Sequence, residues 1–270
     1  HERNIIQFPR DFKYLGRKFG GSQRLPTLLW SAMQELGQKA LPQLSLWDDP
    51  VRRDGPDQMA CDEALLQVAQ VPVLRVFRWS EPWVSAGYFV AMDEARAVRP
   101  DLPVCRRWTG GGIVVHEGDF TFALSVPKTE SLATLRAAES YREIHAALVH
   151  ALIELGCAAE LSGVSAKAPS ECFAAPVEHD VTAQGSKIAG GAQRRTRHGL
   201  LHQGSVQTAE PLPREFGEIL ARCLASSVEK WSPPEGFEGR VRELSTEKYA
   251  SARFLAGPNG SMNFTGADVS

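Results

Sequence analysis

The order of short strand-like runs and isolated helical segments constrains the fold of this chain more than any other feature. Alternating apolar runs, separated by turns that carry glycine or proline, predict strands over residues 73–77, 83–88, 104–108, 113–115, 121–126, 179–183, 187–193 and 200–206. A doubly wound parallel sheet would carry a GxGxxG motif after its first strand, and none is present there. We therefore expect an α+β fold with a mixed or antiparallel sheet and flanking helices.

The helices are predicted from caps and apolar faces. Ser140 and Glu143 have the spacing of a capping box, apolar residues recur on one face of the segment that follows, and Gly156 supplies its stop. Further helices are expected over residues 57–68, 213–225 and 241–252. The helices are thus isolated between groups of strands, which is typical of an α+β domain.

Length and composition indicate either a single-core domain near its upper size or one domain with a small appendage. A chain of 270 residues with 43% hydrophobic and 23% charged residues is ordinary for a single globular core. The first residues are rich in arginine and lysine, show little apolar periodicity and lack the apolar core of a secretory signal. We expect residues 1–43 to form an N-terminal extension, either disordered or used to dock a partner, and residues 44–270 to form the domain.

Charge and cysteine content narrow the function classes. A formal net charge of −2 argues against a nucleic-acid partner, and no apolar run approaches the length of a membrane span, so we expect no membrane partner either. The five cysteines are scattered, with no CxxC pair and an odd count. This pattern indicates a reducing, cytoplasmic compartment without a disulfide framework or structural zinc.

A glycine triplet preceded by two arginines marks the first candidate site. The segment, called here the glycine loop, reads Arg106, Arg107, Trp108, Thr109, Gly110, Gly111 and Gly112. Glycines lack Cβ atoms, so backbone N–H groups can face a carboxylate or phosphate directly, and the Thr109 hydroxyl adds a donor. The spacing to a lysine and to a serine or threonine is not that of a P-loop. The alternative is a tight hairpin without a ligand.

A lone lysine among small residues marks the second candidate site. This lysine segment reads Lys187, Ile188, Ala189, Gly190, Gly191, Ala192, Gln193, Arg194 and Arg195. The small residues let the backbone lie close to a ligand, and the Gln and Arg side chains can bind carbonyl, carboxylate or phosphate oxygens. Most lysines are solvated surface residues, but the neighbours of Lys187 are too small and apolar to favour a surface strand. We therefore take Lys187 as a candidate catalytic residue.

His116 and Asp119 follow the glycine loop. A histidine and a carboxylate at this spacing can bind a metal, but no third or fourth ligand stands near them in the sequence, so we expect no metal site. The alternative is a turn that Asp119 stabilises beside a half-buried His116.

The glycine loop and the lysine segment, in this order, resemble the two signature segments of the lipoate-protein ligase and octanoyltransferase family, whose catalytic domain is shared with biotin protein ligases. Residues 58–66, 77–79, 85–89 and 201–206 extend the resemblance across residues 44–232. It implies a biotin/lipoate protein ligase-like catalytic domain over residues 44–270. Single-chain bacterial lipoate ligases usually carry a further C-terminal accessory domain, and the residues after 232 are too few for it.

The resemblance also implies an acyl-binding pocket. The segment after the glycine loop implies that His116 lines the pocket, and the hairpin that contains Trp79 and Tyr88 borders it. We expect a narrow apolar tunnel, with Val114 in its wall, because a buried CH₂ contributes roughly 0.8 kcal/mol. The expected acyl and substrate contacts are Trp79, Tyr88, Arg106, Arg107, Thr109, Gly110, Gly111, Gly112, His116, Gly190, Gly191, Ala192 and Gln193.

Cys172 and Lys187 decide the mechanism. Cys172 stands in a polar, proline-bounded segment where a thiol has no packing reason to be, and a nearby Lys187 ammonium would stabilise its thiolate. Alternatively, Lys187 set among cations such as Arg194 and Arg195 would lose its proton and serve as a base. One branch of the family, the octanoyltransferases that resemble lipoate ligases, carries a Cys-Phe pair at the position of Cys172, although ligases can carry a cysteine nearby.

Three functions are therefore open. The leading one is transfer of an octanoyl or lipoyl group through an acyl-Cys172 thioester, without a cofactor. Its donor would be an octanoyl- or lipoyl-carrier protein, and its acceptor a lysine of a lipoyl domain or a glycine cleavage H-like protein. The second is a lipoate-protein ligase that uses ATP and Mg and forms lipoyl-adenylate. The third is a non-catalytic module that binds the acyl group or carrier.

Overall fold

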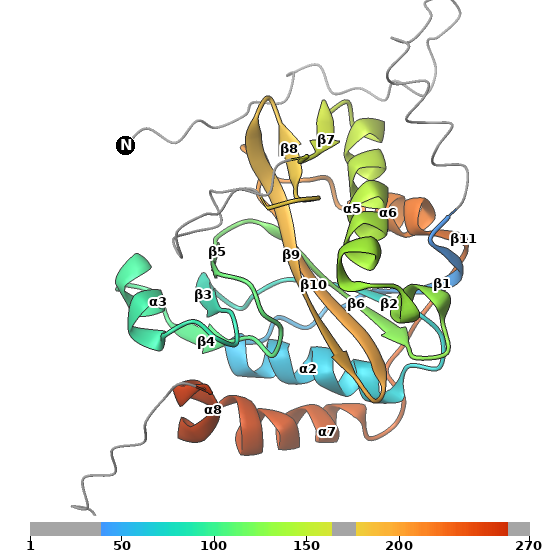
Figure 1. Ribbon diagram of the computed structural model, residues 1–270. Coiled ribbons are helices and arrows are strands. Elements are labelled where there is room, and N and C mark those ends of the chain that lie inside the picture. The colour runs from blue at the N-terminus through green and yellow to red at the C-terminus, as the bar shows by residue number, and fades with distance from the viewer. Residues whose placement is uncertain (1–38, 164–176, 259–270) are drawn as a thin grey trace, which may run out of the picture.

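The computed structural model describes residues 39–163 and 177–258, which form two sheets and their flanking helices (Figure 1). The larger sheet has the strand order β11-β1-β2-β6-β10-β9-β8-β7, and the smaller has the order β4-β3-β5. The strands are β1 (Leu41–Asp48), β2 (Val73–Phe77), β3 (Trp83–Ala86), β4 (Val104–Arg106), β5 (Ile113–His116), β6 (Phe120–Pro127), β7 (Ala159–Leu161), β8 (Val181–Ala183), β9 (Ser186–Thr196), β10 (Gly199–Val206) and β11 (Ala225–Lys230).

The larger sheet is mixed, as the sequence predicts. Strand β1 pairs in parallel with both β2 and β11, whereas every pair in the remaining order β2-β6-β10-β9-β8-β7 is antiparallel. In the smaller sheet, β3 is parallel to β4 and antiparallel to β5. The sequence analysis missed β7 at one edge of the larger sheet, and it missed β1 and β11, which form the parallel edge.

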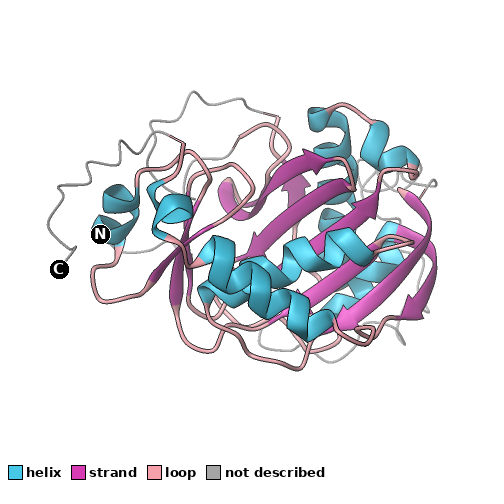
Figure 2. Cartoon of the chain, turned by 90° about the horizontal axis from the view of Figure 1, so that it is seen from below, coloured by secondary structure: helices cyan, strands magenta, loops and turns pink. Residues whose placement is uncertain are grey.

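Alternating side chains along the central strands build a separate core on each face of the larger sheet. On β2, Leu74 and Val76 belong to one core, while Val73 and Phe77 belong to the other. Helices α5 (Ala137–Glu154) and α6 (Phe216–Leu224) cover the first face. Helices α2 (Gly55–Val68) and α7 (Phe237–Leu244) cover the second (Figure 2). The arrangement confirms the α+β prediction.

Helix α5 begins earlier than its predicted capping box. The Glu139 carboxylate accepts a hydrogen bond of 3.0 Å from the N–H of Arg136, so the cap lies one turn before Ser140. The prediction of a start at Ser140 is therefore wrong. Ser140 lies inside the helix, where its hydroxyl bonds to the carbonyl of Arg136. Gly156 follows the helix with φ +80°, as the predicted stop requires.

The remaining helices are short and contact strands of either sheet. Helix α3 (Met92–Val98) packs against β3 and β4, and α4 (Ser131–Thr134) precedes α5. After α7, a π-helical turn η2 (Ser245–Tyr249) and helix α8 (Ala252–Ala256) continue the chain, and α8 lies beside β4. No helix in the described part of the chain is long and apolar enough to span a membrane.

The predicted domain boundary lies close to the first strand. Strand β1 begins at Leu41, ahead of the boundary predicted at residue 44, and its pairing with β2 and β11 makes it part of the main sheet. Residues 1–38 lie outside the described residues, so the N-terminal extension stays a prediction.

Candidate functional site

The glycine loop, between β4 and β5, lies against the lysine segment on β9. A Cβ built on Gly111 would stand 3.3 Å from the Cβ of Ala192. Arg194 donates a hydrogen bond of 3.0 Å to the carbonyl of Trp108, and its guanidinium lies 4.6 Å from the centroid of the Trp108 ring. The two segments singled out from the sequence therefore meet in the folded chain.

A β-bulge determines which face of β9 carries Lys187. Val181 pairs with Ala189 but Thr182 pairs with Lys187, so Ile188 is an extra residue on β9. In a regular strand, residues three apart lie on opposite faces. Because of the bulge, Lys187 instead shares the face of Gly190, whose Cβ position lies 2.7 Å from the Lys187 Cε. Lys187 thus lies on the same face as Ala192, which contacts the glycine loop.

Lys187 forms an ion pair with a buried carboxylate. Its Nζ lies 2.8 Å from Oδ2 of Asp180, and the two side chains are 10% and 0% exposed. Oδ1 of Asp180 accepts a hydrogen bond of 2.5 Å from the hydroxyl of Tyr141 on α5. The partner described for Lys187 is thus an anion. Arg194 instead donates to the carbonyl of Trp108, and Arg195 bonds to the hydroxyl of Ser140.

Gly190 and Gly191 provide space for two different side chains. A Cβ on Gly190 would collide with Cε and Nζ of Lys187, at 2.7 and 2.9 Å. A Cβ on Gly191 would collide with the ring of His202, at 2.5 Å from Nε2, and would stand 3.0 Å from the carbonyl oxygen of Gln203. Packed core atoms therefore require glycine at position 191, whereas a Cβ at position 190 would mainly displace the movable end of the Lys187 side chain.

Two buried histidines lie beneath the lysine segment. Nδ1 of His145 lies 2.7 Å from the carbonyl oxygen of His179, so it carries the proton and donates it. Burial lowers the pKa of His145 to about 4 and the pKa of His202 well below its usual value, so both rings are neutral at pH 7. Gln193 lies 3.3 Å from Nδ1 of His202 through its amide nitrogen, and its amide oxygen accepts from Ser140.

Arg106 fixes the loop that follows β3. Its buried guanidinium donates to the carbonyls of Gly87, Tyr88 and Val90, at 3.1, 2.6 and 2.8 Å. It also donates to the carbonyl of Leu255 on α8, at 3.1 and 2.8 Å. Arg106 therefore holds two segments together through backbone oxygens.

Arg107 supports the glycine loop from inside. It donates to the carbonyls of Gly110 and Gly112, at 3.3 and 2.8 Å, and to the hydroxyl of Ser85. Desolvation lowers the pKa of Arg107 to about 10. Gly111 between these carbonyls has φ +82°, a conformation that favours glycine. The loop geometry thus depends on Arg107 and on Gly111.

Thr109 connects the glycine loop to buried polar side chains on β10 and α2. Its buried hydroxyl donates to the Gln203 side chain at 2.7 Å, and Gln203 in turn donates to Asp62 on α2 at 2.7 Å. Asp62 forms an ion pair of 2.6 Å with the fully buried Arg75. The Thr109 hydroxyl, expected from the sequence to face a ligand, donates into this network.

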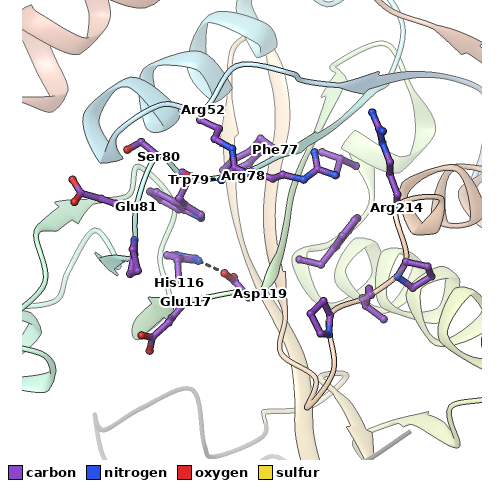
Figure 3. Close-up of a pocket in the computed structure, with 17 residues that line it drawn as sticks. Arg52, Phe77, Arg78, Trp79, Ser80, Glu81, His116, Glu117, Asp119 and Arg214 are labelled. Atoms are coloured by element: carbon purple, nitrogen blue, oxygen red, sulfur yellow. Dashed lines mark hydrogen bonds and ion pairs between the residues drawn. The ribbon is translucent and has the colours of Figure 1, made fainter. Parts of the chain in front are cut away.

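His116 and Trp79 lie side by side at a surface cavity of about 420 Å³ (Figure 3). The His116 ring stacks on Trp79 with centroids 4.3 Å apart, and its Nδ1 lies 2.8 Å from Asp119. Burial alone would raise the pKa of Asp119, but His116 and hydrogen bonds from Ser205 and Thr121 lower it below its usual range. Asp119 thus stabilises the segment after β5, as the alternative in the sequence analysis held, but His116 is buried and not half-buried.

This cavity differs from the tunnel expected for an acyl chain. Arg52, Arg78, Glu81 and Arg214 are among its charged lining residues, and none of its described lining residues belongs to the glycine loop or the lysine segment. Tyr88 does not line it and lies instead beside Arg194 and Phe254. Val114 is half-buried on β5. That Trp79, Tyr88 and Val114 line one acyl tunnel stays a prediction.

Cys172 lies outside the described residues, so its role stays a prediction. The cysteines of the described part, Cys61, Cys105, Cys157 and Cys223, are buried free thiols. Burial raises the pKa of Cys61 and of Cys105 to about 12, so neither supplies a thiolate near neutral pH. In residues 39–163 and 177–258, no group of three His, Cys, Asp or Glu side chains stands together as a metal site.

Sequence reasoning missed Asp180 and Tyr141. Asp180 lies within the strand predicted over residues 179–183, and Tyr141 was assigned to a capping box, so neither had a separate signal. Their proximity to Lys187 depends on how β8, β9 and α5 pack, which local patterns do not determine. The one available hint in the sequence was Asp180, a carboxylate in an apolar strand region that is expected to be buried.

Comparison with known proteins places the chain in a class of catalytic domains that are acyltransferases or ligases. The family model described as the lipoyl protein ligase A/B catalytic domain matches residues 54–251, and the chain belongs to this family. It is similar to octanoyltransferase LipM of Carboxydothermus hydrogenoformans, with 30% identity over 219 residues that span 75% of this chain and 81% of that protein. It is also similar to octanoyltransferase LipM of Oceanobacillus iheyensis, with 32% identity over 164 residues, 57% of this chain and 60% of that protein.

Solved structures support the same fold. Lipoate-protein ligase A bound with ATP superposes with a TM-score of 0.64 at 21% identity, covering 80% of this chain and 99% of that chain. The bipartite lipoate protein ligase of Thermoplasma acidophilum, described with its E2 lipoyl domain, superposes with a TM-score of 0.54 at 20% identity, covering 80% and 96%. The mixed sheet with flanking helices is therefore the fold of lipoate-protein ligases.

Proposed function

We propose that this chain transfers an octanoyl or lipoyl group to a lysine of a lipoyl carrier domain, through a thioester on Cys172. The observation that carries the proposal is the similarity to proteins named octanoyltransferase LipM. The position of Lys187 on the face of β9 that meets the glycine loop supports it, because a cation beside the reacting carbonyl stabilises the charge that develops on its oxygen.

The transfer proceeds in two steps, first to Cys172 and then to the acceptor lysine. The Cys172 thiolate attacks the thioester carbon of the acyl carrier, the carbon–sulfur bond of the donor breaks, and the donor thiolate leaves and takes up a proton. The amine of the acceptor lysine then attacks the new thioester, loses a proton as the amide forms, and releases the Cys172 thiolate. In both steps the Lys187 ammonium stabilises the negative charge on the carbonyl oxygen.

This reaction requires no cofactor. We propose an octanoyl- or lipoyl-carrier protein as donor and a lipoyl domain or glycine cleavage H-like protein as acceptor. The buried free thiols of the described cysteines support a reducing compartment, which we propose is the cytoplasm. If the chain is instead a ligase, ATP and Mg replace the thioester donor, and Cys172 has no chemical role.

Substitution of the two proposed catalytic residues tests this function. Lys187→Ala abolishes transfer under either mechanism, because the acyl oxygen loses its cationic partner. Cys172→Ser leaves at most a slow oxyester intermediate and very low turnover if the chain is a transferase. Near-normal ATP-dependent lipoylation of a lipoyl domain by Cys172→Ser would instead identify a ligase.

A further inference from the structure

Lys187 has a long, flexible side chain, yet the structure holds its charged end beside one carboxylate. The ammonium crosses over Gly190 and ends at a carboxylate that no solvent reaches. We propose that Asp180 is the positioning residue for Lys187, and that Tyr141 acts through Asp180. This inference rests on the role proposed above for Lys187 and extends it to two residues on other elements.

Both carboxylate oxygens of Asp180 are fixed by directional contacts. Oδ2 accepts a hydrogen bond of 2.7 Å from the N–H of Val177 and pairs with the Lys187 ammonium. Oδ1 accepts from the Tyr141 hydroxyl. The peptide before Asp180 is fixed as well, because His145 donates to the carbonyl of His179 at 2.7 Å. The carboxylate therefore has one orientation, and the ammonium follows it.

Tyr141 links this carboxylate to the backbone of the lysine segment. Its hydroxyl donates to Asp180 and accepts a hydrogen bond of 3.0 Å from the N–H of Gly191. Burial and the Asp180 charge raise the pKa of Tyr141 well above its usual value, so the hydroxyl keeps its proton and remains a donor. Helix α5 thus connects the strand that carries Lys187 to the anion that orients it.

For catalysis, these contacts mean that the Lys187 ammonium is already aligned before the substrate binds. A lysine side chain has several rotatable bonds, and an exposed one would sample many positions between turnovers. Here a buried partner and the absence of a Cβ on Gly190 confine the ammonium to one face of β9. A misplacement of about 1 Å can lower a rate by about 100-fold, so removal of Asp180 should affect the rate more than substrate binding.

The test measures kcat and KM with an octanoyl-carrier protein as donor and a purified lipoyl domain as acceptor. Asp180→Asn should lower kcat by roughly 10- to 100-fold while KM changes little, and Tyr141→Phe should lower it by a smaller factor in the same way. Since Tyr141 acts through Asp180, the double variant should be no slower than Asp180→Asn alone. Asp49→Asn, which removes another buried carboxylate paired with an arginine, is the matched control. It should lower the melting temperature without changing kcat.

Four results would overturn the inference or one of its parts. A folded Asp180→Asn variant with wild-type kcat would remove the positioning role, while an inactive Lys187→Ala variant would leave the proposed function intact. A double variant slowed by the product of the two single effects would show that Tyr141 does not act through Asp180. A fully active Lys187→Ala variant would remove the premise itself. If Asp180→Asn does not fold, Tyr141→Phe replaces it as the test, because this change removes only one hydroxyl. A wild-type kcat in the Tyr141→Phe variant would then overturn the inference.

Discussion

Two adjacent glycines on β9 have different purposes at the scale of single residues. A Cβ on Gly190 meets the end of the Lys187 side chain, whereas a Cβ on Gly191 meets the buried His202 ring and the carbonyl of Gln203. We predict that Gly190→Ala displaces the ammonium and lowers kcat at least tenfold with a small change in stability. Gly191→Ala should instead lower the free energy of unfolding by about 1–3 kcal/mol, because a packed core must shift. Activity assays with urea unfolding distinguish the two, and an equally active Gly190→Ala variant would contradict the assignment.

The three glycines of the glycine loop also differ in the reason for which each is glycine. Gly111 needs glycine for its positive φ, so a substitution there tests conformation rather than ligand contact. The Cβ positions of Gly110 and Gly112 have no described heavy atom within 4 Å. If the acyl donor lies against this backbone, Gly112→Ala should raise KM for the octanoyl carrier several-fold and leave the melting temperature nearly unchanged. Unchanged KM in that variant would remove Gly112 from the substrate contacts.

At the scale of elements, helix α8 supports the loop after β3, residues 87–90, through Arg106. Removal of residues 252–270 takes away the Leu255 carbonyl and leaves donors of the buried Arg106 unpaired. An unsatisfied buried donor costs about 1–3 kcal/mol, so we predict a loss of stability in this range. Amide hydrogen exchange should increase at residues 87–90, which Arg106 holds. Unchanged exchange there would show that α8 is dispensable for the loop.

The elements also show where local sequence patterns fail. The central strands and α5 were predictable because alternation and 3.6-residue periodicity report a buried face directly. Strands β1 and β11 were not, since their parallel pairing joins distant segments. The β-bulge at Ile188 was not predictable either, because an extra residue changes the face of Lys187 without altering its neighbours in sequence.

For the whole molecule, the buried neutral histidines make stability depend on pH. An unfolded histidine titrates near pH 6.5, but His145 in the folded chain has its pKa lowered to about 4 by burial. Between these values the unfolded chain binds a proton that the folded chain does not, so stability falls as pH falls from 6.5 to 4. The loss from His145 alone is about 3 kcal/mol at most. Urea midpoints across this range should show it, and His145→Gln should flatten the slope. A pH-independent midpoint would contradict the burial argument.

The candidate site was only partly predictable from the sequence, because some of its residues come together only when the whole chain folds. Lys187 and the glycine triplet are conspicuous because they break the composition expected of a surface strand and of an ordinary turn. Asp180 and Tyr141 are ordinary residues in sequence and meet Lys187 only after the sheet and α5 pack together. Arg106 and Arg107 were expected to bind ligand oxygens, yet their described partners are mainly backbone carbonyls.

The central claim is that an acyl group passes through this chain on Cys172. The most direct measurement is the intact mass of the protein after mixing with octanoyl-carrier protein in the absence of ATP. The account predicts an adduct of octanoyl mass on the wild-type chain, located to Cys172 by peptide mapping and lost when a lipoyl domain is added. Absence of any adduct, together with lipoylation that requires ATP and persists in Cys172→Ser, would contradict it.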